Sequence, residues 1–474
     1  MKKLDGSSCR RPHVLIFPFP AQSHVNTTLK LAEHLCLAGG IDVTFLTSDH
    51  ICNHRLRFTG ALRPFDRWSH FKLETITDGL PEDHPRCGNR VTDMFRSVRA
   101  TTRPAFRYMV VSGRMGPGSG RPPVTCIIAD GIMSFAVDVA KEIGVPSILF
   151  RTVSASCFWA YFCIPRLIEA GHLPFKGNNS DMPINGIPDM EGFLRRRDIP
   201  GFCQCNDLDD VTLRYVINEG QQNFRADAIM FNTFEELESP VLNRIRQNIP
   251  QLYLFGPLHA RLMPRSSPEA IGKSECMAWL DEQADGSVVY LSFGSVVVMT
   301  ASQALELWNG LINSGKRFLW AMRPGSISIP DELIEAARDT GLVVKWAPQE
   351  AVLGHPAVGA FLTHAGWNSA MESLTAGVPM ICWPLYADQF LNARFVSHVW
   401  NVGLGLEGSG CDRAAVERAV REVLDERKDE FRGSAEKFKK LAESQWRNES
   451  PDGSGTSSNS WSCFERLVQD LRAM

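Results

Sequence analysis

The feature that most constrains the fold is a repeated alternation between short β-branched or aromatic runs and stretches with helical spacing of apolar residues. Strand, helix and strand in succession form the unit of a parallel sheet covered by helices on both faces. In the first half the predicted strands are 13–19, 43–48, 124–130, 147–150 and 228–233. The pattern restarts with 288–293, 317–322, 342–345, 358–363 and 380–383. The sequence therefore predicts an α/β protein with two doubly wound parallel-sheet domains in tandem.

The boundary between these domains follows from the positions of residues that break helices and strands. Residues 256–273 contain Pro257, Pro264 and Pro268 without sustained periodicity, which is typical of an interdomain linker. We therefore expect an N-terminal domain over residues 1–255 and a C-terminal domain over residues 274–452. Residues 453–474 carry apolar side chains at helical spacing and predict a terminal helix.

Composition and charge exclude several classes of protein. The chain has 474 residues, of which 44% are hydrophobic and 22% charged, so it is long enough for two sizeable cores and is not a disordered chain. Its 50 Lys+Arg balance 53 Asp+Glu, which leaves a net charge of -3. That balance offers no basic surface for nucleic acid or an anionic membrane. We therefore expect a small molecule as the main partner.

Cysteine usage and hydropathy indicate a compartment. The 13 cysteines show no paired CxxC spacing, so neither a zinc site nor a disulfide framework is predicted. The apolar run at 14–17 is too short for the core of a signal peptide, and no window reaches the about 18 to 20 apolar residues of a membrane-spanning helix. We expect a cytoplasmic, monomeric protein with neither a transmembrane segment nor a bound metal.

Two polar residues lie where strands of the first predicted sheet end, at the edge where open parallel sheets bind ligands. His24 falls in the first turn of the helix after the first strand, where the helix dipole disfavours a second positive charge. The imidazole is therefore expected to stay neutral, as a general base must. Asp130 ends the third predicted strand and would fix the ring tautomer if the two side chains touch. A capping or surface histidine and a helix-capping aspartate are the alternatives, and position leaves them open.

The strongest signal in the chain is the block at residues 346–389. There a predicted strand feeds a glycine turn and a helix that opens at Asn368 and Ser369, whose free amides can receive phosphate oxygens. Glu372, one turn later, can accept hydrogen bonds from ribose hydroxyls, and Trp346 offers a flat face for a base. Taken singly these residues have structural alternatives as caps or core, but at this joint spacing they predict a nucleotide site.

The block resembles the signature box of the plant UDP-dependent glycosyltransferases of the GT-B fold (family 1). The resemblance extends over most of the chain and includes Trp279-Leu280-Asp281 and the run at 288–295. It implies two Rossmann-like domains that face each other across a cleft, with the acceptor bound by the first and the UDP-sugar by the second. It also implies that residues 453–474 cross back onto the first domain.

The same resemblance assigns roles to single residues. His24 matches the catalytic base, Asp130 its partner and Thr152 a residue near the sugar. Trp346 is placed on the uracil, with Gln349 and Glu372 on the ribose. The implied donor-binding residues of the second domain are Gly294, Ser295, Trp346, Ala347, Gln349, His364, Gly366, Trp367, Asn368, Ser369, Glu372, Asp388 and Gln389. Among them, the resemblance places Ser295, His364, Asn368 and Ser369 near the diphosphate, and Trp367, Asp388 and Gln389 on the sugar.

The activity that the resemblance implies is inverting transfer of glucose from UDP-glucose to a hydroxyl or carboxyl of a small lipophilic metabolite, with UDP-glucose as co-substrate and no metal. Trp367, Asp388 and Gln389 offer no cation for the C6 carboxylate of UDP-glucuronate, so that donor is disfavoured. Arg151 is the nearby cation, but strand alternation predicts that it points away.

The acceptor pocket is expected in the first domain. The candidate wall residues are Phe19, Met133, Phe135, Trp159, Phe193 and Phe202, each with plain core packing as its alternative. The stretches 75–86 and 186–200 look similar to plant glucosyltransferases that act on iridoid and other terpenoid aglycones. Terpenoid acceptors are therefore expected first and phenolic acceptors next.

Three motifs predict other chemistry and are rejected. The GxGxxG at 403–408 does not open a helix, so it predicts no dinucleotide site. The DxD at 207–209 follows no strand, and Asp210 is expected to cap the next helix instead of holding a metal. The arginines at 195–197 are expected on a solvated loop face. Two hypotheses from other classes remain: a UDP-sugar-binding protein without turnover, and a nicotinamide-dependent oxidoreductase.

Overall fold

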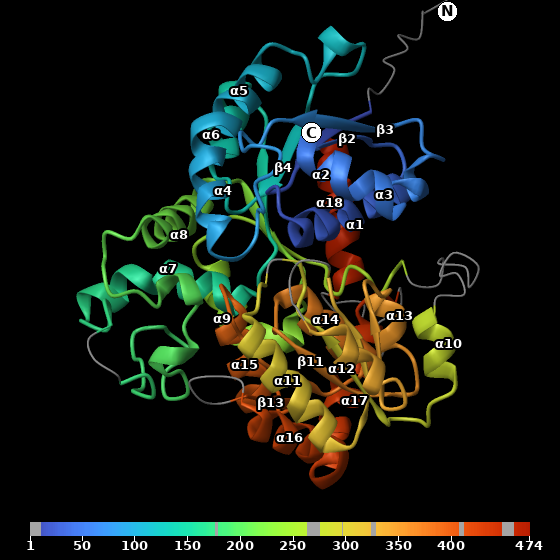
Figure 1. The fold of residues 1–474 in the computed structure, drawn as a ribbon. Helices are drawn as coiled ribbons and strands as arrows, with labels where there is room; N and C mark the ends of the chain where they lie inside the picture. Colours follow the sequence, from blue (N-terminus) through green and yellow to red (C-terminus); the bar gives the residue numbers. More distant parts are fainter. Residues whose placement is uncertain are drawn as a thin grey trace, which may run out of the picture.

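The computed structural model describes residues 11–175, 179–262, 275–295, 297–323, 329–406, 412–447 and 459–474. Two parallel sheets organise the chain and confirm the predicted fold class (Figure 1). The first has the order β3-β2-β1-β4-β5-β6-β7 and the second β10-β9-β8-β11-β12-β13. The strands of the first sheet are β1 (His13–Phe17), β2 (Asp42–Ser48), β3 (Phe71–Ile76), β4 (Cys126–Asp130), β5 (Ser147–Arg151), β6 (Ala228–Phe231) and β7 (Leu252–Leu254). Those of the second are β8 (Val288–Ser292), β9 (Arg317–Ala321), β10 (Gly341–Val344), β11 (Val358–Thr363), β12 (Met380–Cys382) and β13 (Gly403–Gly405).

Three strands, β3, β7 and β13, were not predicted, and all three lie at sheet edges. Strand β3 is only partly buried and alternates charged with apolar residues, so it lacks the continuous apolar run of a central parallel strand. Strands β7 and β13 span three residues each, too few to show a period. The central strands, by contrast, are buried and match the predicted runs.

Helices cover both faces of each sheet (Figure 1). In the first half they are α1 (Gln22–Ala38), α2 (Asp49–Ile51), α3 (Arg57–Thr59), α4 (Val91–Ser97), α5 (Arg103–Val111), α6 (Phe135–Glu142), α7 (Ala155–Glu169), α8 (Val211–Gln222) and α9 (Glu235–Arg246). In the second half they are α10 (Glu275–Asp281), α11 (Ala301–Ser314), α12 (Asp331–Ala336), α13 (Gln349–Leu353), α14 (Trp367–Ala376), α15 (Gln389–Arg394), α16 (Arg413–Arg421), α17 (Lys428–Ser444) and α18 (Ser460–Ala473).

Helix α1 shows how the sequence fixes the first lobe. Its apolar residues recur at helical spacing, and Val25, Ala32 and Leu35 are fully buried against the sheet. Gly39 ends the helix with φ of 70°, a backbone conformation that glycine adopts without strain. The helix thereby starts next to the carboxyl end of β1 and holds its first turn there.

The terminal helix α18 lies against the first sheet although it follows the second in sequence (Figure 1). Phe464, Leu467 and Leu471 are fully buried in the same core cluster as β1 and β2. The hydroxyl of Tyr253 on β7 donates to Asp470 at 2.6 Å. Most of the predicted linker, residues 263–273, and the start of the terminal segment, 453–458, lie outside the described residues, so the domain limits stay a prediction.

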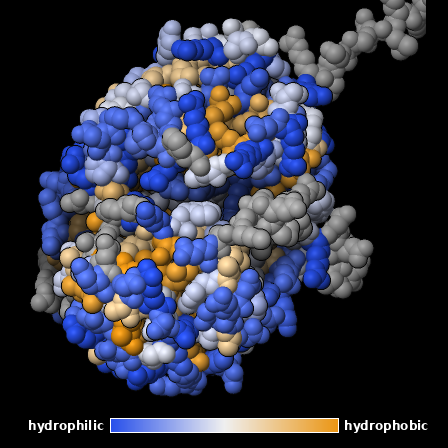
Figure 2. All heavy atoms as spheres, turned by 45° about the vertical axis from the view of Figure 1, so that its right-hand side comes forward, coloured by the Kyte–Doolittle hydropathy of each residue, from blue (hydrophilic) through white to orange (hydrophobic). Residues whose placement is uncertain are grey.

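Hydrophilic residues dominate the face shown in Figure 2, and apolar residues gather there in smaller patches. Within the described ranges, none of the helices combines the length and apolar character that a bilayer crossing requires.

Candidate active site

A cavity of about 1000 Å³ lies between the two sheets and takes wall residues from both. In each sheet the strand order reverses at the central pair, β1 with β4 in the first and β8 with β11 in the second. Such switch points open a crevice at the carboxyl ends of the strands, where ligands of open α/β sheets bind. The loops after these strands supply the polar groups of the cavity.

His24 and Asp130 meet at the first of these switch points. Strands β1 and β4 pair with Phe17 beside Ala129, so the residues that follow them are neighbours across the crevice. Nδ1 of His24 lies 2.7 Å from Oδ2 of Asp130 and 2.9 Å from the hydroxyl of Thr152. With the Nδ1 proton donated to the carboxylate, Nε2 is the basic nitrogen, and the described residues give it no hydrogen bond.

Asp130 is held as an anion by its surroundings. Burial opposes the charge, but the hydrogen bond and charge of His24, together with the backbone N–H of Ile132, lower the pKa of Asp130 below its ordinary value. The N–H of Phe19 donates to the same carboxylate at 3.3 Å. Since helix α6 begins only at Phe135, Asp130 does not act as its cap. The carboxylate therefore orients the imidazole.

The glycine turn of the second lobe follows β11. Ala365 has φ of 61°, a left-handed conformation that turns the chain sharply into α14. The imidazole of His364 lies between two glycines: a Cβ on Gly294 would come within 2.9 Å of the ring, and one on Gly366 within 2.6 Å. Although part of the ring faces the cavity, desolvation lowers the pKa of His364 to about 4. The ring is therefore a neutral hydrogen-bonding group at pH 7.

The first turn of α14 lines the cavity. The N–H of Trp367 donates to Asp388 at 3.2 Å, and the indole N–H donates to the carbonyl of Asn232 in the first lobe at 2.9 Å. The side-chain amide of Asn368 donates to the carbonyl of Ser23, next to His24, at 3.3 Å. This turn therefore lies directly opposite the first turn of α1.

Gln349 connects the residues expected at the ribose. Its amide donates to Glu372 at 2.6 Å and to the hydroxyl of Ser369 at 3.1 Å. Burial, then the charge of Glu350, raises the pKa of Glu372 to about 7, against the opposing charge of Lys30. Lys30 of α1 and Glu350 of α13 also form an ion pair that joins the two lobes. Glu372, Glu350 and Lys30 thus form one cluster of interacting charges in the cavity wall.

Next to this cluster the indole of Trp346 is 69% exposed, which leaves its face free for stacking. On the opposite side of the turn, Asp388 accepts from the side-chain amide of Asn392 at 2.7 Å, and burial raises the pKa of Asp388. The amide oxygen of Gln389 accepts from the N–H groups of Leu385 and Tyr386, both at 2.9 Å. These bonds fix both side chains while leaving the amide NH2 of Gln389 available to a ligand.

Comparisons with known proteins agree with this geometry. Residues 267–433 match the family model described as UDP-glucoronosyl and UDP-glucosyl transferase. The chain is 49% identical over 449 residues to a 7-deoxyloganetic acid glucosyltransferase of Catharanthus roseus, with 91% of this chain and 93% of the relative covered. It is 40% identical over 455 residues to UDP-glycosyltransferase 85A5 of Arabidopsis thaliana, with 92% and 94% covered. The chain belongs to the UDP-dependent glycosyltransferases.

The fold comparison leads to the same family. The structure matches that of a UDP-glucose: anthocyanidin 3-O-glucosyltransferase in complex with UDP with a TM-score of 0.80 at 28% identity, covering 98% of this chain and 99% of the other. The GT-B arrangement and the transferase class expected from the resemblance are thus confirmed. The nicotinamide-dependent hypothesis is set aside by the same findings.

The predicted donor residues all line the same cavity. The residues that line the cavity include Thr152, Gly294, Ser295, Trp346, Ala347, Gln349, His364, Gly366, Trp367, Asn368, Ser369, Glu372, Asp388 and Gln389. His24 lines it as well, and Asp130 lies behind His24. The roles of these residues remain proposals.

The predicted acceptor residues divide into two groups. Phe19 and Phe202 line the cavity. The other four do not lie on its wall and take packing positions instead. Met133 is fully buried, and the ring of Phe135 packs edge-on against Phe17. The indole N–H of Trp159 donates to the carbonyl of Pro188. The ring of Phe193 packs edge-on against Phe395. Apolar character at the right sequence position does not separate a pocket wall from the core behind it, which is why this part of the prediction is wrong.

Several wall residues escaped sequence reasoning. Val91, Met94 and Phe95 of α4 line the acceptor side of the cavity. Their spacing of three and four residues was a readable signal for one helical face. Arg151 also lines the cavity, against the expectation from strand alternation. Alternation holds along β5, but β5 ends at Arg151 and the chain turns there, so Arg151 and Thr152 both reach the cavity.

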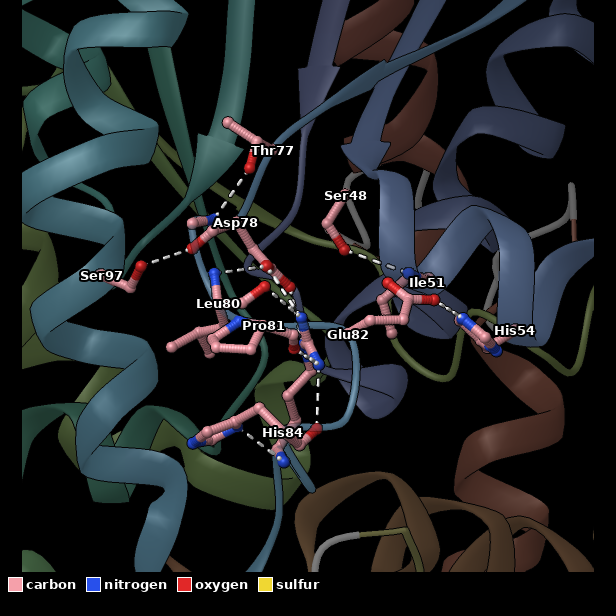
Figure 3. A network of polar contacts seen from close by, with 12 residues as sticks. Ser48, Ile51, His54, Thr77, Asp78, Leu80, Pro81, Glu82, His84 and Ser97 are labelled. Carbon is pink, nitrogen blue, oxygen red and sulfur yellow. Dashed lines mark hydrogen bonds and ion pairs between the residues drawn. The ribbon is translucent and has the colours of Figure 1, made fainter.

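A polar network braces the loop after β3 beside the cavity. Figure 3 shows Asp78, Leu80, Pro81 and His84 gathered at its centre. The guanidinium of Arg86 donates to both oxygens of Asp78, at 2.8 and 3.0 Å, and to the carbonyls of Pro81 and His84. Arg86 lines the cavity, but its charge is already matched by a buried carboxylate. It therefore acts as a brace for the loop.

Next to this loop, His50, His54 and Glu82 form a group with ligand atoms within 4.8 Å of one another, and Figure 3 shows His54 beside Glu82. This is the group of the described residues that has the donor set of a metal site. Burial, then the charge of Arg86, lowers the pKa of His50.

The structure also shows where the residues of the three rejected motifs lie. Gly403 and Gly405 lie in β13, so the GxGxxG does not open a helix. The carboxylate of Asp210 accepts from the N–H of Leu213 at 2.8 Å and caps α8 as predicted. The prediction of a solvated face for 195–197 is wrong: Arg196 is buried, and Arg195 pairs with Asp198 at 2.9 Å. Aspartates in the surrounding loop supply the countercharge that the prediction left out.

Proposed function

We propose that this protein transfers glucose from UDP-glucose to a hydroxyl or carboxyl of a small lipophilic plant metabolite, with inversion at the anomeric carbon, and forms a β-glucoside. The observation that carries the proposal is the 2.7 Å contact between His24 and Asp130 on a cavity whose opposite wall is the donor box. A protein that only binds UDP-sugars has no need for this pair.

His24 is the proposed general base. Its Nε2 takes the proton of the acceptor hydroxyl while the acceptor oxygen forms a bond to the anomeric carbon. The bond from that carbon to the β-phosphate oxygen breaks on the opposite face, and UDP leaves with the electron pair. Asp130 stabilises the imidazolium that results, because its carboxylate already accepts from Nδ1. The proton later passes to solvent, which restores the base.

The charge that develops on the leaving diphosphate is met by the first turn of α14. Free backbone amides at a helix N-terminus favour anions, and Ser369 and Asn368 add polar side chains there. The neutral imidazole of His364 lies beside this turn, where its N–H is held by the backbone carbonyl of Ser292. We propose that these donors suffice without a metal ion, and turnover in the presence of a chelator tests this.

Glucose is the proposed sugar. Asp388 and Gln389 present hydrogen-bonding groups at the end of the donor wall, and a carboxylate at C6 would face the acidic Asp388 there. Turnover with UDP-glucose, UDP-galactose and UDP-glucuronate in competition tests the assignment. A preference for glucuronate would contradict it.

Terpenoid acceptors, including iridoids, are proposed first and phenolics next. The support is the 49% identity to a glucosyltransferase named for 7-deoxyloganetic acid, together with the apolar wall formed by Phe19, Phe95 and Phe202. A panel of hydroxylated terpenoids, terpenoid acids and flavonoids with UDP-glucose, followed by mass spectrometry, is the deciding experiment. Binding of UDP-glucose without any product across the panel would favour a binding protein.

We further propose that the protein is a cytoplasmic monomer. The cysteines of the described residues are all unpaired, as in a reducing compartment. Light scattering of the purified protein and the location of a fluorescent fusion test the two statements separately.

A further inference from the structure

Arg151 is a charged side chain buried in the cavity wall with little to compensate its charge. It is 3% exposed, and its Nε and Nη1 atoms have no hydrogen-bond partner among the described residues. Yet it lines the cavity. A buried guanidinium without hydrogen bonds is strongly unfavourable unless an anion meets it. The proposed glucosyl transfer assigns no role to Arg151.

The immediate surroundings hold the side chain in place. Its guanidinium carbon lies 5.1 Å from the ring centre of Phe158, a cation–π contact. Gly131 gives it room, since a Cβ at that position would lie 2.1 Å from Cδ of Arg151. Asn223 lies beside the same glycine, and its amide nitrogen donates to the Gly131 carbonyl at 2.6 Å. The arginine is thus packed in a fixed position from several sides.

Two acidic residues lie near enough to influence Arg151, and neither occupies its donors. Asp130 is committed to His24 and to the backbone N–H groups of Phe19 and Ile132. Glu219 accepts from the N–H of Ser134 at 2.8 Å. Burial raises the pKa of Glu219, which favours the neutral carboxyl group. Among the described residues, no acidic side chain is therefore hydrogen-bonded to the guanidinium, which meets the cavity only at its wall.

The wall on this side belongs to the first lobe and is largely apolar, although Tyr161 and Glu219 also line it. Ile132 and Val216 line the cavity together with Phe95 and Phe202. A ligand group that reaches Arg151 is therefore part of a largely hydrocarbon molecule. The sugar side of the cavity, in contrast, carries the acidic Asp388, which disfavours a second carboxylate.

We infer that Arg151 binds a carboxylate of the acceptor, so that the natural acceptor is a lipophilic hydroxy acid whose hydroxyl reaches His24 while its carboxylate pairs with Arg151. This inference rests on the proposed glucosyl transfer and narrows it. It places the new glycosidic bond at the hydroxyl and leaves the acid group free in the product. A guanidinium suits this task because it is always charged and forms charge-assisted hydrogen bonds to carboxylate oxygens.

The test compares a monoterpenoid hydroxy acid with its methyl ester, which keeps the shape and removes the charge. The wild-type enzyme, Arg151→Met and Arg151→Lys are assayed with UDP-glucose, and the ratio of kcat/KM for acid over ester is the readout. We expect the acid to be favoured about tenfold or more by the wild type. Arg151→Met should lower that ratio about tenfold, and Arg151→Lys should retain part of it. Arg96→Met, at a side chain 61% exposed on α4, is the matched control and should keep the wild-type ratio.

Each other outcome overturns the inference in a distinguishable way. An equal loss for acid and ester in Arg151→Met would show that Arg151 only supports Asp130 and His24. A base-labile glucose ester as product would place the carboxylate at His24 instead. Strong use of UDP-glucuronate that Arg151→Met abolishes would assign the guanidinium to the donor.

Direct binding separates this inference from the proposed transfer. Calorimetric titration of the UDP complex with the acid and with the ester measures the carboxylate contact without turnover, and stabilisation by UDP verifies that each variant is folded. If neither compound is glucosylated, the proposed function fails, yet selective binding of the acid that Arg151→Met removes would still support the site. Equal binding of acid and ester would overturn it.

Discussion

The two walls of the cavity were built in different ways. Most of the donor wall comes from one segment of the second lobe, residues 346–389, where a strand, a sharp turn and a helix follow one another directly. The acceptor wall is assembled from α4, the end of β5, the loop after β1 and other loops of the first lobe, which lie far apart in sequence. The first is specified by backbone geometry and the second by side-chain packing.

This difference predicts how each wall tolerates substitution. A site made by a tight turn depends on a few residues at which neither an added Cβ nor a different backbone conformation is tolerated. A site made by packed apolar side chains tolerates changes of shape, which alter the acceptor that fits. Enzymes that keep one donor and vary their acceptor would use such a division.

The largest expected effect comes from His24, which links the two walls. His24→Ala removes the base and should lower kcat by about 10²- to 10⁴-fold. The Kd for UDP, measured by calorimetry, should stay close to that of the wild type, because the donor wall lies on the other lobe. The exposed His398→Ala is the matched control. Turnover by His24→Ala at the wild-type rate would show that the base is another group.

A second test is directed at the donor wall. Gly366→Ala would place a Cβ 2.6 Å from the imidazole of His364 and push the ring out of position. Overpacking of this kind typically costs about 1–3 kcal/mol, so the Kd for UDP should rise by roughly tenfold to a hundredfold. Gly405→Ala is the control, since a Cβ there meets nothing within 4 Å. A wild-type Kd in Gly366→Ala would mean that the turn is not specified by its backbone.

The same division explains what could be predicted from the sequence. The central strands and the donor block were readable because their signals are local, a continuous apolar run or a fixed spacing of polar residues. Met133 and Phe193 were misplaced because the choice between core and pocket depends on which distant element covers them. Arg151 was misplaced for a related reason: the alternation of a strand ends with the strand, and the sequence does not show where the chain turns.

The acceptor wall is tested with two apolar residues, Phe202 and Met133, which were both predicted from the sequence to line the acceptor pocket. Phe202 lines the cavity and meets Tyr386 of the other lobe edge-on, with ring centres 4.7 Å apart. Phe202→Ala should raise the acceptor KM about fivefold with little loss of stability. Met133 is fully buried, so Met133→Ala should lower the free energy of unfolding by about 2–5 kcal/mol.

Acceptor KM and thermal unfolding are measured on both variants, and each variant should change only one of the two quantities. Phe202→Ala changes the KM and Met133→Ala changes the stability. Two variants that alter both quantities in parallel would remove the distinction between wall and core on this side of the cavity.

The smallest effect concerns the pH response of the donor wall. The pKa of Glu372 is raised from 4.5 to about 7, chiefly by burial and then by the charge of Glu350. Between these two values the folded state holds a proton that the unfolded state has lost. The contribution of this group to stability is therefore complete below pH 4.5 and is lost as the pH rises through 7.

Binding of the ribose should respond in the opposite direction, because a carboxylate accepts hydrogen bonds about twice as strongly as a neutral carboxyl. The Kd for UDP should fall about two- to threefold between pH 6 and 8, by the same principle of charge assistance. Glu372→Gln keeps the shape and removes the titration, so its Kd should be flat over that range, and its loss of stability toward pH 7 should be reduced. If the variant and the wild type show parallel pH profiles in both measurements, the ionisation that controls the donor wall belongs to another member of the Lys30–Glu350 cluster.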